Sequence, residues 1–173
     1  MIIQFNDLHI ISSQYCDKSE ATHALNGIPD VVFVDGTFGT DHYHVIICRT
    51  PNGDLGVAIE GARGTIPSAL FKDSYLVIGC GSKLCFIDLT QKRQLCEHHV
   101  NTFYQFITSN EGSDIIVMQE TGVSSYTLRG GGLWHFETPD IITDWLVSDN
   151  EISLILFEGN ELKIDRKTGS TFL

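Results

Sequence analysis

The sequence is short of positive charge. It carries 11 Lys and Arg against 22 Asp and Glu, which gives a formal net charge of −11. Binding to nucleic acid or to an anionic membrane needs clustered cations, so this balance argues against both as partners. It favours a basic protein partner instead, because opposite charges attract.

Long apolar runs are missing too. No stretch approaches the ~20 apolar residues of a membrane-spanning helix. The N-terminal MIIQFNDLHI has no basic segment ahead of a long apolar core, as a secretory signal would have. The five cysteines form no Cys-x-x-Cys pair; they are Cys16, Cys48, Cys80, Cys85 and Cys96. These absences predict reduced thiols, no disulfide framework and a cytoplasmic location.

Catalytic signatures are scarce. There is no nucleophile elbow, P-loop or His-Glu-x-x-His motif. The best metal candidate is Asp41–His44, because His42 and His44 would point to one face of a strand. Zinc would need a third ligand such as His98 or His99, which are adjacent and would face opposite sides. We therefore predict no cofactor, no metal and no enzymatic activity, with a metal-dependent hydrolase built on His42 and His44 as an alternative.

The sequence is rich in short runs of β-branched and aromatic residues broken by Gly, Asn and Asp. Helical periodicity is confined to Asp17–Leu25. Hydrophobic residues make up 42% and charged residues 19% of the 173 residues, an ordinary composition for one folded domain. The pattern predicts an all-β protein.

The apolar runs recur with a period near 38 residues. Four of them end in a turn residue, and these turn residues (Asp35, Asp73, Asn110 and Asp149) are separated by 38, 37 and 39 positions. A strongly apolar second strand and a third strand follow each turn. The second strands are His44–Cys48, Tyr75–Gly79, Asp114–Met118 and Ile152–Leu156. A short fourth strand closes the last three repeats, and four antiparallel strands in such a repeat are typical of a β-propeller blade.

This pattern predicts a small or partial β-propeller of about four antiparallel four-stranded blades. The repeats cover approximately residues 30–65, 66–99, 100–138 and 139–173 of a single domain. The first repeat is irregular, with a delayed second strand and a missing or vestigial fourth strand. Residues 1–29 precede the repeats and do not follow their spacing, and they are expected to supply an edge strand. We expect Leu76, Val77, Ile116 and Leu154 to be buried between or within the sheets.

Three segments resemble the PQQ-type β-propeller repeat: LCFIDLTQKRQL, YTLRGGGLWHFET and LKIDRKTGSTF. Its consensus runs Leu-Tyr-Ala-Leu-Asp-x-x-Thr-Gly-Lys-x-x-Trp. The consensus positions are occupied by Leu84–Asp88, Leu162–Asp165, Thr168, Gly169 and Trp134. The resemblance implies a propeller whose tryptophan packs between blades. It does not imply quinone binding, because the chain is far shorter than the eight-bladed quinoproteins and lacks their adjacent-cysteine pair. Four blades can close, as in hemopexin-like domains, stay open, or be completed by a homodimer.

Acidic residues are concentrated in the last two repeats. Between Gly130 and Leu162 there are seven carboxylates and no Lys or Arg. In a propeller, the turns between second and third strands and the connections between blades emerge on one face. We predict that this face also holds Asp54 and binds the partner. The predicted partner-binding residues are Glu120, Trp134, Glu137, Asp140, Glu158 and Glu161. The cations Lys92, Arg129, Arg166 and Lys167 are expected on the other face.

These features favour a non-enzymatic, propeller-like protein-binding module. An acidic face bordered by aromatic residues suits a basic partner, because charge raises the association rate and aromatic contacts add affinity. The most concrete form is a small acidic protein that masks a basic partner, as immunity proteins mask nuclease toxins. A scaffolding or assembly propeller is an alternative, and solubility is an alternative explanation of the charge.

Overall fold

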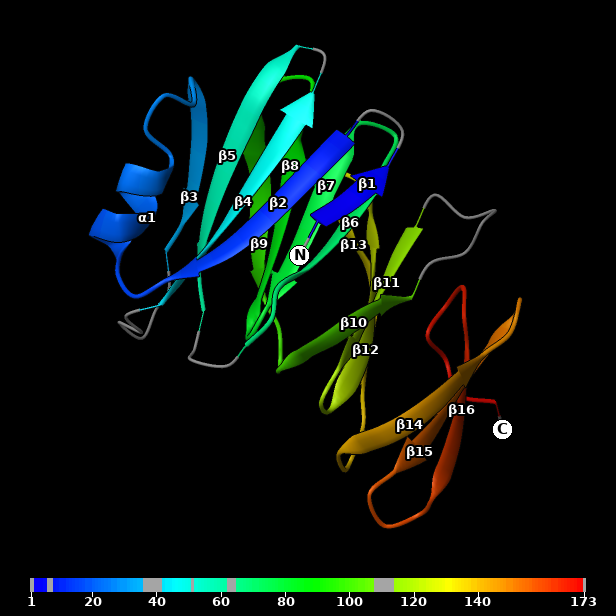
Figure 1. Ribbon diagram of the computed structural model, residues 1–173. Helices are drawn as coiled ribbons and strands as arrows, with labels where there is room; N and C mark the ends of the chain where they lie inside the picture. The colour runs from blue at the N-terminus through cyan, green and yellow to red at the C-terminus, as the bar shows by residue number, and fades with distance from the viewer. Residues whose placement is uncertain are drawn as a thin grey trace.

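The computed structural model describes residues 2–5, 8–35, 42–50, 52–61, 65–107 and 114–172. The described residues form four β-sheets and one short helix. The sheets follow one another along the chain, from the helix at the left of Figure 1 to the C-terminal strands at the lower right. They are numbered here in chain order as sheets 1 to 4.

Sheets 2 to 4 are antiparallel meanders and match the last three predicted repeats. Sheet 2 contains β6 (Ser68–Lys72), β7 (Tyr75–Cys80), β8 (Lys83–Asp88) and β9 (Arg93–His99). Sheet 3 contains β10 (Phe103–Ile107), β11 (Asp114–Gln119), β12 (Gly122–Thr127) and β13 (Gly132–Glu137). Sheet 4 contains β14 (Ile142–Val147), β15 (Glu151–Leu156) and β16 (Glu161–Asp165). Its fourth strand is reduced to one bridge between Ile164 and Thr171. The turn predicted at Asn110 lies outside the described residues.

Sheet 1 has five strands in the order β1-β2-β4-β5-β3. They are β1 (Ile2–Phe5), β2 (Leu8–Tyr15), β4 (Tyr43–Thr50), β5 (Gly53–Glu60) and β3 (Asp30–Val34). The first four pair antiparallel, as in the other sheets, but the short helix and β3 lie between β2 and β4 in the chain. The strand β3 is added to the outer edge, parallel to β5.

The strand assignment of the first predicted repeat is therefore wrong. We expected the strand that ends at Asp35 to be the first of the blade, followed by β4 and β5. Instead, β2 pairs with β4 from His9 opposite Arg49 to Tyr15 opposite Tyr43, and this long ladder occupies the edge of β4 that the expectation gave to β3. The strand β3 pairs with the free edge of β5, and residues before position 30 supply two strands of the blade.

Two lysines of sheet 2 hold the ends of β3. The ammonium of Lys92 lies 2.8 Å from the Asp30 carboxylate, at the start of β3. The ammonium of Lys83, which is buried, donates to the carbonyl of Asp35 just after β3 and lies 3.8 Å from the Glu97 carboxylate. These contacts tie the added strand to the neighbouring sheet.

The core consists of apolar layers between the sheets. Along β7, Leu76 and Ile78 pack in the layer shared with sheet 1, while Val77 packs in the layer shared with sheet 3. Side chains of a strand alternate between its faces, so a strand covered on both sides must be apolar throughout. This explains the continuous apolar second strands. The predicted burial of Leu76, Val77, Ile116 and Leu154 is confirmed, since each is at most 1% exposed.

The helix α1 (Lys18–Ala24) covers the outer face of sheet 1, in the segment where helical periodicity was predicted. Asp17 caps it by accepting a hydrogen bond from the Glu20 backbone, 2.8 Å away. The helix packs through Ala21 and Leu25. Close contact requires glycine at position 56 of β5, because a Cβ there would lie 2.5 Å from Cδ2 of Leu25. No helix in the described part of the chain is long and apolar enough to cross a membrane.

The cysteines allow a direct test of the fold. All five are free thiols, and burial raises the pKa of Cys48 and Cys85 to about 12. We expect the exposed Cys16 to react quickly with a thiol reagent in the native protein, while Cys48 and Cys85 react only on unfolding. Titration of denatured, unreduced protein should yield five thiols. Cys16→Ser should remove the fast phase, and recovery of a single thiol would contradict the structure.

Candidate functional site

One end of sheets 3 and 4 carries a line of carboxylates. Five of the predicted partner-binding residues lie there and are called the acidic rim: Glu120, Glu137, Asp140, Glu158 and Glu161. The backbone of Glu120 bonds to Thr102 and Ile142, so it joins the turn β11–β12 to the starts of β10 and β14. The Asp140 carboxylate accepts a hydrogen bond from the Glu158 backbone, at 3.2 Å, which joins the connection β13–β14 to the turn β15–β16.

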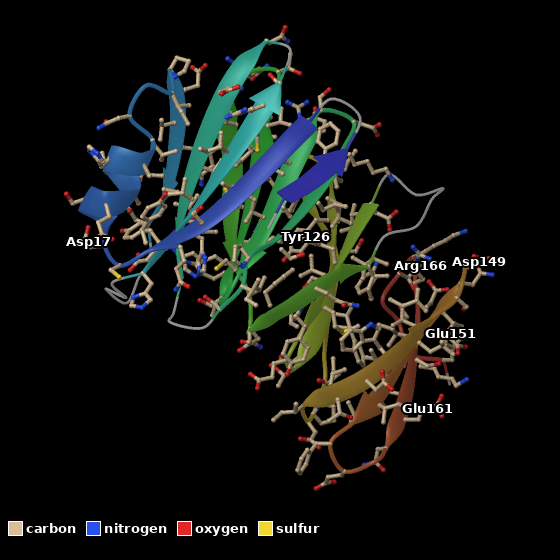
Figure 2. The ribbon with its side chains drawn as sticks, viewed as in Figure 1. Asp17, Tyr126, Asp149, Glu151, Glu161 and Arg166 are labelled. Carbon is tan, nitrogen blue, oxygen red and sulfur yellow. The ribbon has the colours of Figure 1, made fainter. Side chains whose placement is uncertain are left out.

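The other two rim residues continue this line. Glu137 ends β13 opposite Gly122, which starts β12 directly after the turn that holds Glu120. Glu161 begins β16 opposite Ile155 and lies 3.7 Å from the Lys163 ammonium. Figure 2 shows Glu161 towards the lower end of sheet 4, while Asp149 and Arg166 lie towards its upper end. The fold thus brings together five of the six predicted residues.

Trp134 is the exception, because it lies between sheets rather than on the rim. It is half-buried in the apolar layer between sheets 3 and 4. A Cβ at Gly169 would lie 2.5 Å from Cε3 of Trp134, and Gly169 has φ of +70°. Gly169 follows β16, at the end of that strand away from Glu158 and Glu161. The packing agrees with the PQQ-type resemblance, and a role of Trp134 in binding stays a prediction.

Asp54 lies at the opposite end of the sheets, so its predicted place beside the rim is wrong. It lies at the start of β5, opposite Arg49 of β4, and these are the third and fourth strands of their blade and not the second and third. The start of β5 lies beside Lys92, whose ammonium would be 3.0 Å from a Cβ at Gly53. As predicted, Arg129, Arg166 and Lys167 occupy turns at this end.

The two histidines of the metal candidate lie at the start of β4. His44 faces sheet 2, is 4% exposed, and its Nε2 has no hydrogen-bond partner among the described residues. His98, named as a third ligand, lies elsewhere, with Nε2 2.7 Å from the Gly130 carbonyl. Among the described residues, no group of three or more His, Cys, Asp or Glu side chains could hold a metal ion. Asp41 lies outside those residues.

Burial gives His44 an effect on stability. Desolvation lowers its pKa, and the charge of His42 adds to this. The unfolded chain then binds more protons than the folded one as pH falls through the ordinary histidine pKa of about 6.5. The free energy of unfolding should be highest above that pH and decrease below it. In urea unfolding across pH, His44→Phe should weaken this decrease. Equal pH profiles for wild type and His44→Phe would contradict the assignment.

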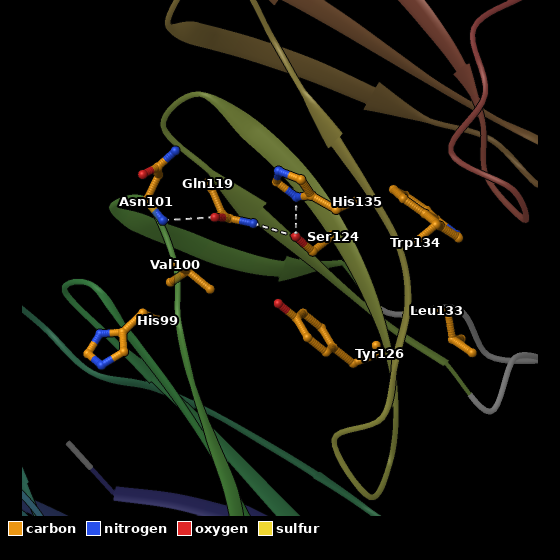
Figure 3. Close-up of a pocket in the computed structure, with 10 residues that line it drawn as sticks. His99, Val100, Asn101, Gln119, Ser124, Tyr126, Leu133, Trp134 and His135 are labelled. Carbon is orange, nitrogen blue, oxygen red and sulfur yellow. Dashed lines mark hydrogen bonds between the residues drawn. The ribbon is translucent and has the colours of Figure 1, made fainter.

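A pocket of about 610 Å³ opens where the outer parts of sheets 2 and 3 meet. Its walls come from the end of β9 and the connection after it, and from β12 and β13 (Figure 3). The lining residues are His99, Val100, Asn101, Gln119, Ser124, Tyr126, Gly132, Leu133, Trp134 and His135. Trp134 and His99 were named separately from the sequence, but the pocket that they line together was not predicted, because the lining residues come from distant strands and turns.

A chain of hydrogen bonds crosses the floor of this pocket. The Asn101 backbone donates to Oε1 of Gln119 at 2.9 Å, and Nε2 of Gln119 donates to Ser124 at 2.6 Å. The Ser124 hydroxyl lies 2.8 Å from Nδ1 of His135. The chain is complete when Ser124 donates to Nδ1, which leaves the imidazole proton on Nε2. His135 then presents a donor to the exposed side of the pocket.

The Tyr126 hydroxyl adds a second polar group. Tyr126 is 8% exposed, and its ring packs against Phe86 and His98. Its hydroxyl makes no hydrogen bond within the described residues. The pocket therefore offers donors from Tyr126 and His135 between apolar walls, an arrangement suited to a neutral acceptor such as a peptide carbonyl. Ser124 is 3% exposed, which keeps substrate from its hydroxyl and argues against a catalytic Ser-His pair.

Two substitutions distinguish these hydroxyls. Ser124→Ala leaves the buried Nε2 of Gln119 without an acceptor and should reduce the free energy of unfolding by about 1–3 kcal/mol. Tyr126→Phe removes a hydroxyl that has no protein partner and should change it by less than about 0.5 kcal/mol. Urea unfolding measures both. Similar losses for both variants would contradict the assignment.

No protein-family model matches the sequence. No curated protein matches it either. Solved structures do resemble it. A fragment of HIRA aligns over 100% of this chain and 52% of its own, with a TM-score of 0.54 and 10% identity. BamB from Moraxella catarrhalis aligns over 82% of this chain and 51% of its own, with a TM-score of 0.51 and 11% identity. A europium-containing methanol dehydrogenase aligns over 61% of this chain and 23% of its own, with a TM-score of 0.47 and 16% identity.

These comparisons identify the fold. The HIRA and BamB structures are β-propellers, so the predicted all-β propeller class is confirmed, and the PQQ-type resemblance is confirmed at the level of the fold. At such low identities the likeness concerns the fold alone. The chain spans about half the length of the HIRA and BamB chains that it matches.

Proposed function

We propose that this chain is a non-enzymatic, propeller-like protein-binding module that binds a basic partner protein through the acidic rim. The observation that carries the proposal is the alignment of the rim. Three separate connections, after β11, β13 and β15, place carboxylates along one end of two sheets. Among the described residues, these connections contain no Lys or Arg. A surface of one sign steers an oppositely charged partner and speeds its association.

In its most concrete form, the chain masks the basic surface of its partner, as an immunity protein masks a toxin. The net charge of −11 on 173 residues supports this form, and the five free thiols suit a cytoplasmic location. A scaffolding or assembly role is the second candidate. We do not propose the hydrolase, because His44 points into the space between sheets 1 and 2.

Charge reversal on the rim tests this function. Glu137, Glu158 and Glu161 are suitable because their side chains are exposed. Asp140 is left unchanged because its carboxylate accepts backbone hydrogen bonds from Ile141 and Glu158. Changing the three glutamates to Lys should slow association with the purified partner at least about tenfold at low salt. The effect should shrink as salt shortens the Debye length from about 30 Å at 0.01 M to about 8 Å at 0.15 M.

The matched control reverses three carboxylates at the other end of the sheets: Asp54, Asp73 and Asp149. The partner is first identified by affinity purification and mass spectrometry, and its association rate is then measured by stopped flow. The control variant carries the same change in net charge and should associate faster than the rim variant. If the rim variant folds and associates at the wild-type rate, the carboxylates serve solubility only.

A further inference from the structure

Sheet 4 has one face that no described residue covers. Sheets 2 and 3 contribute to apolar layers on both sides, and α1 covers the outer face of sheet 1. Sheet 4 packs on sheet 3 through Ile152, Leu154 and Ile164. On its other face, no described residue packs against it, and in Figure 1 it is the last sheet of the row.

The strand register identifies the residues of this face. Because Ile152, Leu154 and Leu156 point inwards, the alternate residues of β15 and its turn point outwards. Asp144 and Glu161 lie beside Ile155 in the neighbouring strands, and Leu146 and Lys163 lie beside Ser153. The sheet 4 outer face is defined as Asp144, Leu146, Glu151, Ser153, Ile155, Phe157, Glu161 and Lys163.

Three large apolar side chains on this face are exposed to solvent. Leu146 is 74% exposed, Ile155 42% and Phe157 73%. A strand that faces water usually alternates apolar and polar residues, but the outward positions at Ile155 of β15 and at Phe157 of the following turn are apolar. Single exposed apolar residues are common, whereas these three lie on one sheet face and together form an apolar centre that a partner can bury.

The charges around these side chains indicate what covers them. Asp144, Glu151 and Glu161 lie on the same face, and Glu158 follows Phe157. The cation of the face, Lys163, is held by Glu151 at 3.0 Å and by Glu161 at 3.7 Å. A partner with an apolar centre and Lys or Arg around it would complement this pattern. A second copy of this chain, docked through the same face, would bring like charges together.

The size of the face links it to the acidic rim. Three strands with about five residues each cover roughly 15 by 17 Å, or about 250 Å². A stable protein–protein interface buries about 800 Å² on each partner, so a partner on this face must extend beyond it. Glu158 and Asp140 lie immediately beyond Phe157 and Ile141, which places the acidic rim at the border of the contact.

We propose that the sheet 4 outer face is the docking surface for a basic partner protein, with Leu146, Ile155 and Phe157 as its apolar centre and the rim carboxylates at its border. The positive charge expected of the partner rests on the proposed function. The apolar contact depends only on the exposure of these side chains. Apolar contact sets the residence time of the complex, and the charged border sets its rate of formation.

The test uses the full chain and a phage-displayed random peptide library as the probe. Peptides selected on the wild-type protein should combine aromatic or aliphatic residues with Lys or Arg. Ile155→Ser with Phe157→Ser should weaken their binding at least tenfold, measured by titration calorimetry. The matched control is Ile66→Ser with Val31→Ser, two side chains that are 79% and 36% exposed and lie outside this face and outside the pocket. It should bind the peptides as the wild type does.

A second measurement keeps the result independent of the variants. The selected peptides should shift amide NMR signals of sheet 4 in the wild-type protein, and leave those of sheet 1 unchanged. Equal binding to both double variants, or shifts confined to other sheets, would overturn the proposal. So would a wild-type dimer in analytical ultracentrifugation that dissociates in Ile155→Ser with Phe157→Ser, because the occupant would then be a second copy. If rim reversal leaves the partner's association unchanged while the peptides still require Ile155 and Phe157, the proposed function fails and the docking face stands.

Discussion

The structure depends on one constraint: a sheet with apolar side chains on both faces must be covered on both. Sheets 2 and 3 are of this kind, as Leu76 and Ile78 on one side of β7 and Val77 on the other show. Removing such surfaces from water is worth about 25 cal/mol per Å², and face-to-face sheets are separated by about 10 Å. Stacking follows from this, and it places the turns of successive sheets at common ends. The acidic rim and the pocket between β9 and β13 are consequences of the same arrangement.

The last three repeats could be predicted because the residues that determine their strand pairing lie close together in the sequence. A turn residue, an apolar strand and a second turn recur within each repeat, and every strand pairs with its neighbour in sequence. The first repeat could not be predicted this way. The spacing from Asp35 to Asp73 matched the later intervals, but Asp35 ends a parallel outer strand and not a hairpin. The pairing of β4 in the first blade is set by its ladder with β2. These two strands are separated in the chain by a helix and another strand.

The same distinction applies to the candidate sites. The rim positions of Glu120, Asp140 and Glu158 follow from strand order alone, so the sequence sufficed for them. Asp54 was misplaced because its blade begins two strands earlier than the pattern indicated. The chain from Gln119 through Ser124 to His135 joins three strands and has no sequence signature. The apolar run around Ile155 predicts a buried strand. Its side chain is exposed because no described sheet packs on that face of sheet 4.

The two ends of the stack of sheets differ in how their outer faces are covered. At sheet 1, Ala21 and Leu25 of α1 cover the apolar surface, so further sheets have no apolar face to dock on. At sheet 4, Leu146 and Phe157 remain in water beside carboxylates. Exposed apolar surface invites unspecific association, and net negative charge opposes it. The carboxylates around Ile155 thus have two effects. They repel acidic surfaces, including another copy of the chain, and they attract basic surfaces. In the proposed complex, these carboxylates select the partner by repulsion as well as by attraction.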